Sequence, residues 1–551
     1  MRMWGIGPPH LIGRTLRWST TLCLVPLVFW LGWIFYQSYA PDLLITGGLI
    51  VDGTGQTPYR ADVAIRNGKI IGISKWRYWL SQPKTRIYAD GKVVAPGFID
   101  VHTHVEGNLP NKGIFKPENF LWQGVTTIIT GNCGRSRTDV GEMLAGLEKH
   151  GTLINVATLV GHNSVRRAVM GQDARVPTAQ ELLKMQQMVG QAMEDGALGF
   201  STGLAYTPGR FAQTQELVSL ARAAAERGGI YASHVRDEAH DGEHAIQEAL
   251  EVGRRAGAVT QISHLKCSGR AQWQTMQRRL ELLNQARAAG LQVYADAYPY
   301  DRSSTTTDVL LPDWAVAEKR AGLRQVATDV QLRQRLQADI LSKLSRDGWT
   351  DLHFVTLVAG KPEWIGRSLA DVPSHATTLD QQVENLIEIS LRGGAQAVFA
   401  DMHETDVALA IKYPFGVFGS DSAVRDAEAA YKPHPRGSGT FPRLLRSYVR
   451  ERSQLDLAEA IRKASGFAAE IFGLAERGTL LPGNWADIVI FDFEQITDKA
   501  DYEQPFAEPV GIDYVIVNGA VTVERGTVNE RQPAGMSLRN LKTKALTIAQ
   551  R

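Results

Sequence analysis

The sequence predicts an α/β fold, a (β/α)8 barrel combined with a small β domain, and three observations support this class. Eight short apolar strand candidates follow one another through the middle of the chain, with amphipathic helical stretches between several of them. Asn-Gly hairpin signals stand near both ends. Residues with metal-ligand side chains follow five of the eight strands, as expected at the carboxyl-terminal face of a barrel. A doubly wound open sheet is the alternative arrangement of the same units.

The N-terminal region carries a membrane signal. Residues 18–41 contain no charged side chain, and as a helix these 24 residues would span about 36 Å, enough to cross a bilayer core. Three arginines precede this run, and Asp42 follows it. By the positive-inside rule, we expect residues 1–17 in the cytoplasm, residues 18–41 as a single-pass anchor in the lipid bilayer, and the rest periplasmic or extracellular. A cleaved signal peptide is the alternative.

Both ends of the remaining chain predict short strands and tight turns. Residues 63–71 and 515–523 each have the pattern of a hairpin around an Asn-Gly pair, which readily takes the positive φ angles of a type I′ turn. Neither end alone supplies enough strands for a stable sheet. We therefore expect residues 42–95 and 476–535 to form one small β-sandwich domain, followed by a tail over 536–551.

The region between these ends, residues 96–475, is expected to form the barrel. The predicted strands are 98–102, 125–130, 155–160, 197–201, 230–233, 259–263, 292–296 and 417–420. A capping-box pattern from Thr178 to Glu181 marks the start of one helix. Residues 298–415, between the last two strands, are too many for a β/α loop and are predicted to form an inserted lid.

Length and composition limit the possible functions. The 551 residues exceed what one hydrophobic core supports, so at least two domains are expected. The 60 basic and 58 acidic residues nearly balance, which gives no electrostatic case for nucleic-acid binding. The three cysteines imply no disulfide framework.

Side chains that bind metals recur at the predicted strand ends. His102 and His104 follow the first strand and, two residues apart, point to the same side of an extended chain. The other candidates, at four further strand ends, are Cys133, His234, His264 and Asp421. Each alone has an ordinary explanation, as a hydrogen-bonded histidine, a small buried thiol or a helix cap. Together, four imidazoles, a thiol and a carboxylate predict a zinc site.

Several motifs resemble the D-aminoacylase, or N-acyl-D-amino-acid deacylase, branch of the amidohydrolase superfamily. They are His102-Thr103-His104, Gly131-Asn132-Cys133-Gly134, Ser263-His264-Leu265-Lys266, Gly419-Ser420-Asp421, His434-Pro435-Arg436, Gly439-Thr440-Phe441-Pro442-Arg443 and residues 477–487. The resemblance extends over about residues 42–530. It is specific, because most amidohydrolases use a carboxylated lysine where this branch uses a cysteine. It implies a metal-dependent hydrolase barrel.

The resemblance also implies two metal positions. The tight zinc position would be held by Cys133, His234 and His264. A weaker second position would be held by His102, His104 and Asp421, with Cys133 able to bridge the two. Asp421 would in addition act as the catalytic base that takes a proton from water and later delivers it to the leaving amine.

An anionic substrate is implied as well. Arg436 offers a planar fork to a carboxylate, and Lys266 adds a second positive charge. The remaining substrate contacts would be Tyr206, Tyr298 and Ser303. His162, at the end of the third strand, is expected to line the site without binding metal.

These implications give an expected function and three alternatives. The expected function is a membrane-anchored zinc amidohydrolase that converts N-acyl-D-amino acids into a carboxylate and a free D-amino acid. A dipeptidase acting on a C-terminal D residue would use the same carboxylate contacts. A cyclic-amide hydrolase is disfavoured by Cys133, because no lysine ligand is recognisable. A membrane-tethered scaffold without catalysis should have lost metal ligands, whereas all of them are present here.

Overall fold

The computed structural model describes residues 40–75, 78, 81–109, 112–427 and 430–540, and its centre is a closed barrel of parallel strands. In order around the barrel, the strands are β8 (Phe98–Asp100), β9 (Val125–Thr130), β10 (Asn155–Thr158) continued by β11 (Val160–Gly161), β12 (Gly199–Gly203), β13 (Ile230–His234), β14 (Thr260–Ile262), β15 (Val293–Ala297) and β19 (Gly416–Phe418).

The ring closes between its first and last strands. The backbone N–H of Val101 donates to the carbonyl of Phe418 at 3.3 Å, and Thr103 forms a parallel bridge with Ser422. An open sheet would leave both of these edges unpaired. The closure therefore confirms the predicted barrel and excludes the doubly wound alternative.

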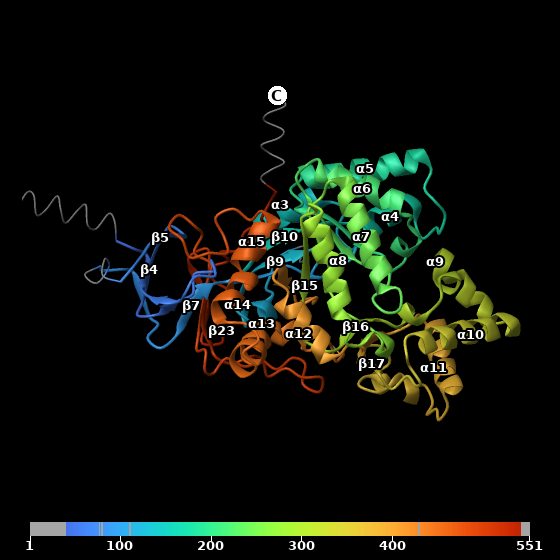
Figure 1. Ribbon diagram of the computed structural model, residues 1–551. Coiled ribbons are helices and arrows are strands. Elements are labelled where there is room, and N and C mark those ends of the chain that lie inside the picture. The colour runs from blue at the N-terminus through green and yellow to red at the C-terminus, as the bar shows by residue number, and fades with distance from the viewer. Residues whose placement is uncertain (1–39, 76–77, 79–80, 110–111, 428–429, 541–551) are drawn as a thin grey trace, which may run out of the picture.

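Helices surround the barrel as the β/α alternation requires (Figure 1). The longer ones are α3 (Val140–His150), α4 (His162–Met170), α5 (Ala179–Glu194), α6 (Thr214–Ala225), α7 (Gly242–Ala256), α8 (Met276–Ala288), α12 (Glu404–Lys412), α13 (Arg436–Arg443) and α14 (Leu457–Ala464). The predicted capping box begins α5, with Thr178 and Glu181 bonded reciprocally. Shorter elements are α2 (Glu118–Leu121), the 3-10 turns η1 (Gly209–Phe211) and η2 (Arg270–Gln272), the π-helix η6 (Leu444–Glu451) and α15 (Gly466–Phe472).

The interior of the barrel is packed with apolar side chains. Ile99, Ile129 and Val417 belong to one buried cluster inside the ring. Phe467 and Phe472 of α15 belong to the same cluster and cover one end of it. Since this end is filled, a polar site has room only at the opposite, carboxyl-terminal end of the strands.

A second body of strands combines both ends of the chain. A seven-stranded sheet has the order β23 (Thr527–Val528), β22 (Ala520–Glu524), β21 (Ile512–Val517), β20 (Ile488–Phe491), β7 (Val93–Pro96), β2 (Leu49–Ile50) and β3 (Tyr59–Arg60). A four-stranded sheet has the order β5 (Lys69–Ser74), β4 (Asp62–Arg66), β1 (Leu43–Thr46) and β6 (Thr85–Tyr88). Both Asn-Gly pairs turn hairpins with positive φ, at Asn67 and at Asn518. The exact boundaries of this domain and of the barrel stay predictions.

The insertion between β15 and β19 folds around its own core. Its sheet has the antiparallel order β16 (Ser303–Thr306), β18 (Gln396–Phe399) and β17 (Val355–Leu357). Its helices are α9 (Asp313–Val326), α10 (Val330–Arg346) and α11 (Leu379–Leu391), with 3-10 turns η3 (Thr307–Leu310), η4 (Pro362–Trp364) and η5 (Leu369–Asp371). Leu336, Leu386 and Phe399 belong to a buried cluster separate from that of the barrel. In Figure 1 this lid lies on the far side of the barrel from the β domain.

The predicted membrane anchor needs correction. No helix in the described part of the chain is long and apolar enough to cross a membrane. Residues 18–39, which make up almost all of the predicted span, lie outside that part. The prediction of a transmembrane helix, and the bilayer contact and extracytoplasmic location that depended on it, are therefore withdrawn.

A buried ionic network joins the β domain to the barrel. Arg477 pairs with Asp487, and both side chains are at most 5% exposed. Asp487 also accepts hydrogen bonds from the backbone of Asn518 at 2.8 Å and from the side chain of Asn155, the first residue of β10, at 3.1 Å. Removing the carboxylate would leave a buried guanidinium without its counter-charge, which typically costs about 3–5 kcal/mol.

Asp487→Ala should therefore unfold at a clearly lower denaturant concentration than the wild-type protein. The matched control is Glu476→Ala, because Glu476 pairs with Lys69 at the surface, where solvent screens the attraction and such pairs contribute little to stability. Urea titration followed by circular dichroism compares the three proteins. Equal midpoints for the two variants would show that the network adds nothing beyond a surface pair.

Candidate functional site

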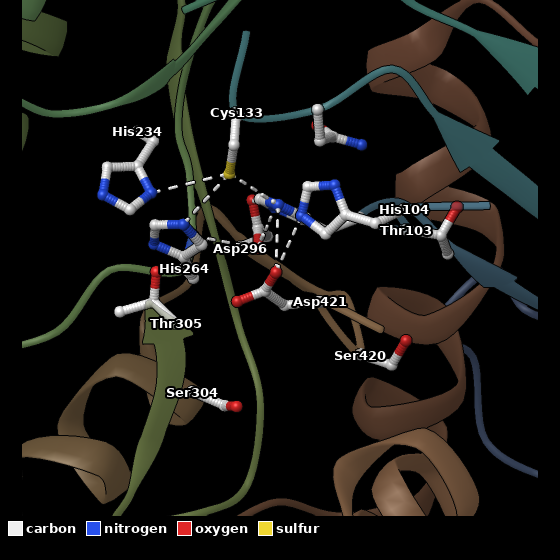
Figure 2. Close-up of polar contacts among 12 residues, drawn as sticks. Thr103, His104, Cys133, His234, His264, Asp296, Ser304, Thr305, Ser420 and Asp421 are labelled. Atoms are coloured by element: carbon white, nitrogen blue, oxygen red, sulfur yellow. Dashed lines mark hydrogen bonds and ion pairs between the residues drawn. The ribbon is translucent and has the colours of Figure 1, made fainter. Parts of the chain in front are cut away.

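The predicted metal ligands converge at the carboxyl-terminal end of the barrel (Figure 2). His102 and His104 follow β8, Cys133 follows β9, His234 ends β13, His264 follows β14, and Asp421 follows β19. Their ligand atoms form two groups, and within each group all of these atoms lie within 4.8 Å of one another. Cys133 belongs to both groups.

The first group consists of Cys133, His234 and His264. The Cys133 Sγ lies 3.5 Å from Nδ1 of His234 and 3.4 Å from Nε2 of His264. Tetrahedral zinc with ordinary bond lengths to sulfur and nitrogen separates those two ligand atoms by about 3.5 Å. The donor set and its spacing thus fit a zinc ion.

The second group consists of His102, His104, Cys133 and Asp421. The Cys133 Sγ lies 3.2 Å from Nε2 of His102. The Asp421 Oδ1 lies 2.9 Å from Nε2 of His104 and 3.6 Å from Nε2 of His102. A thiolate, two imidazoles and a carboxylate are all zinc ligands, so this group fits a second metal position.

Unusual backbone angles aim three of these side chains. Cys133, His264 and Asp421 have φ values of 50°, 34° and 50°, in the left-handed region that non-glycine residues seldom adopt. Gly131 precedes Cys133 with φ of 80°, and a Cβ there would overlap the carbonyl of Leu159. Such conformations persist only where the surroundings hold them, and they often occur at functional sites.

The electrostatics favour a charged sulfur. Burial raises the pKa of Cys133, but the positive charges of His102, His264 and His234 outweigh this and hold the pKa well below its usual value. Burial likewise opposes a charged His104, yet Asp421 and Cys133 raise the pKa of that imidazole to about 9. Burial raises the pKa of Asp421, but the positive charges of Arg436 and His102 lower it by more. The pKa of this carboxyl therefore lies well below its usual value, and the group is ionised at neutral pH.

Two carboxylates that the sequence analysis did not assign orient the histidines. Asp296 lies 3.2 Å from Nδ1 of His102 and accepts the backbone N–H of His264 at 2.9 Å. Glu238 lies 2.9 Å from Nδ1 of His264. Partners of this kind fix the ring and tautomer of a metal-binding histidine. The sequence feature that could have identified these two carboxylates is their position, since Asp296 ends a predicted strand and Glu238 lies four residues after His234.

Arg436 and Tyr298 lie together beside Asp421. Arg436 begins α13, its Nη1 lies 2.9 Å from Oδ2 of Asp421, and its guanidinium lies 4.7 Å from the Tyr298 ring centre. Among the described residues, neither the Nε of Arg436 nor the Tyr298 hydroxyl has a hydrogen-bond partner, although both are buried. Buried donors of this kind are uncommon and call for an acceptor.

The other predicted substrate residues have partners within the chain. Lys266 donates to Glu238 at 2.7 Å. Ser303 donates to Asp401 at 2.9 Å. The Tyr206 hydroxyl accepts from Thr305 of the lid at 3.0 Å. His162 contacts Glu216 at 2.8 Å and belongs to neither ligand group.

A cleft of about 880 Å³ opens above the predicted metal ligands. His104, Cys133 and Asp421 contribute to its lining, together with Tyr206 and Arg436. Lid residues from β16 and η3 close one side, and the loop after β9 together with the start of α4 closes another. The cleft has ample room for a small-molecule ligand.

A closed β/α barrel with such a cluster at its carboxyl-terminal face is typical of metal-dependent barrel enzymes. A family model described as "Amidohydrolase family" matches residues 87–523. The chain therefore belongs to the amidohydrolase family and, within it, to the D-aminoacylase branch that its motifs indicated.

Individual relatives agree with this assignment. An N-acyl-D-glutamate deacylase from Alcaligenes xylosoxydans xylosoxydans is 35% identical over 519 residues, which cover 89% of this chain and 95% of that protein. A D-aminoacylase from the same organism is 32% identical, with 87% and 94% covered. The crystal structure of an N-acyl-D-glutamate deacylase from Bordetella bronchiseptica, complexed with zinc and a phosphonate inhibitor, matches with a TM-score of 0.76 at 34% identity and covers 91% and 100% of the two chains.

The lowered pKa of Cys133 predicts a thiolate at neutral pH even without metal. A thiol with an ordinary pKa of about 8.5 is mostly neutral at pH 7, whereas a lowered pKa keeps the sulfur charged there. Chelator-treated wild-type protein should thus show more thiolate ultraviolet absorbance at pH 7 than chelator-treated Cys133→Ser. A difference that develops only near pH 8.5 and above would contradict the lowered pKa.

Proposed function

We propose that this chain is a zinc-dependent amidohydrolase that cleaves the amide of N-acyl-D-amino acids, giving a carboxylate and a free D-amino acid. The observation that carries the proposal is the position of the buried donors of Arg436 and Tyr298, directly beside the clustered metal ligands. A carboxylate acceptor and a hydrolytic centre are thereby adjacent. The deacylase relatives support the same reaction class.

Cys133, His234 and His264 would hold the tight zinc. The thiolate and two imidazoles form a compact tetrahedral set with one position left for a ligand. His102, His104 and Asp421 would hold a weaker second ion through the shared Cys133. When bound, zinc polarises an amide carbonyl and makes water a better nucleophile near neutral pH.

Asp421 is the proposed proton carrier. Its Oδ2 faces Arg436 and its Oδ1 faces His104, so the carboxylate lies between the substrate clamp and the metal ligands. Because it is ionised, it can accept a proton from the attacking water and return it to the leaving nitrogen. A substrate carboxylate that pairs with Arg436 shares the guanidinium charge, which weakens the hold of Arg436 on Asp421 and makes Asp421 a stronger base.

Arg436, Tyr298 and Lys266 form the proposed clamp for the α-carboxylate. The unpaired Nε of Arg436 and the Tyr298 hydroxyl are its direct donors. The Lys266 ammonium lies 5.8 Å from the Tyr298 ring centre and supplies long-range charge. Tyr206 is proposed as a contact on the lid side of the cleft. Ser303 would have to exchange its bond to Asp401 for one to substrate, and its role stays a prediction.

A dipeptidase acting on a C-terminal D residue is the second candidate. The 880 Å³ cleft favours it, because the space exceeds what a small acyl group fills. The same clamp would hold the C-terminal carboxylate. A panel of acetylated D- and L-amino acids and L-D dipeptides tests both candidates. If the enzyme turned over neither the acetylated D-amino acids nor the L-D dipeptides, the proposal would be refuted.

Cys133→Ala should lose the tight zinc. Two imidazoles remain, too few to retain the ion against water and chelators. Metal analysis of the purified protein after dialysis against a weak chelator should find about one zinc per wild-type chain and far less in the variant. Full zinc content in Cys133→Ala would show that the cysteine is only a core residue.

Asp421→Asn should keep the tight zinc, since Cys133, His234 and His264 remain. Turnover should nevertheless fall by about 10²–10⁴-fold, because an amide cannot accept the proton. The measurement is kcat on one N-acyl-D-amino acid, with zinc content as the control. A near-normal kcat would remove Asp421 from its role as base.

Arg436→Ala should chiefly raise KM, because the substrate carboxylate loses its clamp. Some fall in kcat is expected as well, since the clamp also positions the amide. Arg436→Lys retains the charge without the planar fork and should recover part of the loss. Unchanged kcat and KM in Arg436→Ala would refute the clamp.

A further inference from the structure

Two arginines on the cleft wall have no counter-charge among the described residues. Arg135 follows Cys133 on the loop after β9, and Arg167 lies on α4, directly after β11. Both are exposed. Arg167 donates to the carbonyl of Thr207 at 3.3 Å, and no carboxylate pairs with either guanidinium. The proposed chemistry of deacylation uses neither of them.

Most of the other charges in the cleft have a partner of opposite sign. Arg425 is an exception, since it donates to the carbonyl of His434 at 3.2 Å and has no ion pair among the described residues. Arg436 pairs with Asp421, and Arg210 pairs with Asp313 of the lid. Asp308 pairs with Arg320. The carboxylate nearest in sequence to the metal ligands on this side is Glu106, whose Oε1 accepts hydrogen bonds from Thr130 and from the backbone of Gly131. The wall around Arg135 and Arg167 is therefore left with net positive charge.

Strand order places this wall opposite Lys266 and Tyr298 of the carboxylate clamp, whereas Arg436 follows β19, which lies between β15 and β8 in the ring. In a ring of eight strands, those four places apart face each other, so β9 faces β14 and β11 faces β15. Lys266 follows β14 and Tyr298 follows β15, whereas Arg135 and Arg167 follow β9 and β11. Cys133 follows the same strand as Arg135, and His264 follows the same strand as Lys266, so the 3.4 Å contact between Cys133 and His264 connects the two sides.

The geometry of an N-acyl amino acid fits this arrangement in one direction. In a trans amide, the Cα of the amino acid and the carbon chain of the acyl group lie at opposite ends of the planar unit. With the α-carboxylate on Arg436 and the amide at the metal ligands, the acyl chain extends toward Arg135 and Arg167. The substrate side chain, in contrast, leaves from the same Cα as the clamped carboxylate.

We propose that Arg135 and Arg167 bind a second carboxylate, at the far end of the acyl group, so that the preferred substrates are D-amino acids carrying a dicarboxylic acyl chain or an acidic N-terminal residue. This inference rests on the proposed deacylase function. Ser164 lies one turn from Arg167 on the same face of α4 and lines the cleft as well. Its Oγ accepts the backbone N–H of Ser136 at 3.0 Å, and the hydroxyl can still donate its own hydrogen to a carboxylate beside the two guanidinium groups.

The test compares glutaryl and pentanoyl derivatives of the D-amino acid that the wild-type enzyme turns over best. The two acyl groups have the same number of carbon atoms and differ in the terminal carboxylate. One or two charge-assisted contacts to exposed arginines predict a kcat/KM ratio of about 5 to 30 in favour of glutaryl, falling as salt is added. In the double variant Arg135→Gln/Arg167→Gln the ratio should fall toward one, and each single variant should lose part of it.

Arg254→Gln is the matched control. Arg254 is an exposed arginine in the last turn of α7, which ends at the other face of the barrel, and the variant should keep the wild-type ratio. A second pair of substrates, acetyl-D-glutamate and acetyl-D-glutamine, measures charge on the side chain instead. The double variant should leave this second ratio unchanged.

The possible outcomes distinguish failure of the second carboxylate site from failure of the proposed deacylase function. Turnover of acetyl-D-amino acids with a glutaryl-to-pentanoyl ratio near one would overturn the second carboxylate site and leave the deacylase function standing. A different outcome would overturn the acyl assignment. If the double variant lost the preference for acetyl-D-glutamate over acetyl-D-glutamine but kept the preference for glutaryl over pentanoyl, the two arginines would bind a carboxylate on the substrate side chain. Absence of any D-amide turnover would overturn both.

Discussion

The structure depends on burying a negatively charged sulfur among imidazoles. A lone thiolate in an apolar interior is costly, so Cys133 is stable only where positive charge surrounds it. His102, His234 and His264 supply that charge, and each comes from a different strand of the barrel. Correct closure of the ring is therefore a condition for the sulfur to be charged. The same closure brings Asp421 beside His104 and Arg436 beside Asp421.

Repeating local patterns predicted most of the fold. All eight barrel strands lie within a few residues of their predicted ranges, and the Asn-Gly pairs at 67–68 and 518–519 turn the expected hairpins. Local chemistry decides these elements, so the sequence carries them directly. The anchor over residues 18–41 was inferred from an uncharged apolar run and the arginines that precede it, and the described part of the chain contains no helix that would support it.

The site was predictable in its ligands but less so in their surroundings. Each predicted metal ligand stands at or just after the end of a strand, which is where barrel sites are expected and where the sequence analysis looked for it. Asp296 meets His102 only because the barrel joins segments 194 residues apart, and no spacing rule encodes that contact. Ser303 likewise contacts Asp401 across 98 residues of the insertion, and no spacing rule predicts that hydrogen bond either.

The lid is an insertion with its own apolar core. It leaves the barrel after β15 and returns before β19, and its outer strands β16 and β17 both pair with β18. Its apolar core is its own, yet Thr305, Thr306 and Gln396 from its sheet line the cleft. Mutations in this insertion can thus reshape the wall that meets the substrate while the metal ligands keep their supports. Over evolutionary time, such a division lets one hydrolytic centre serve many acylated amines, with selection acting on the insertion and the barrel at different rates.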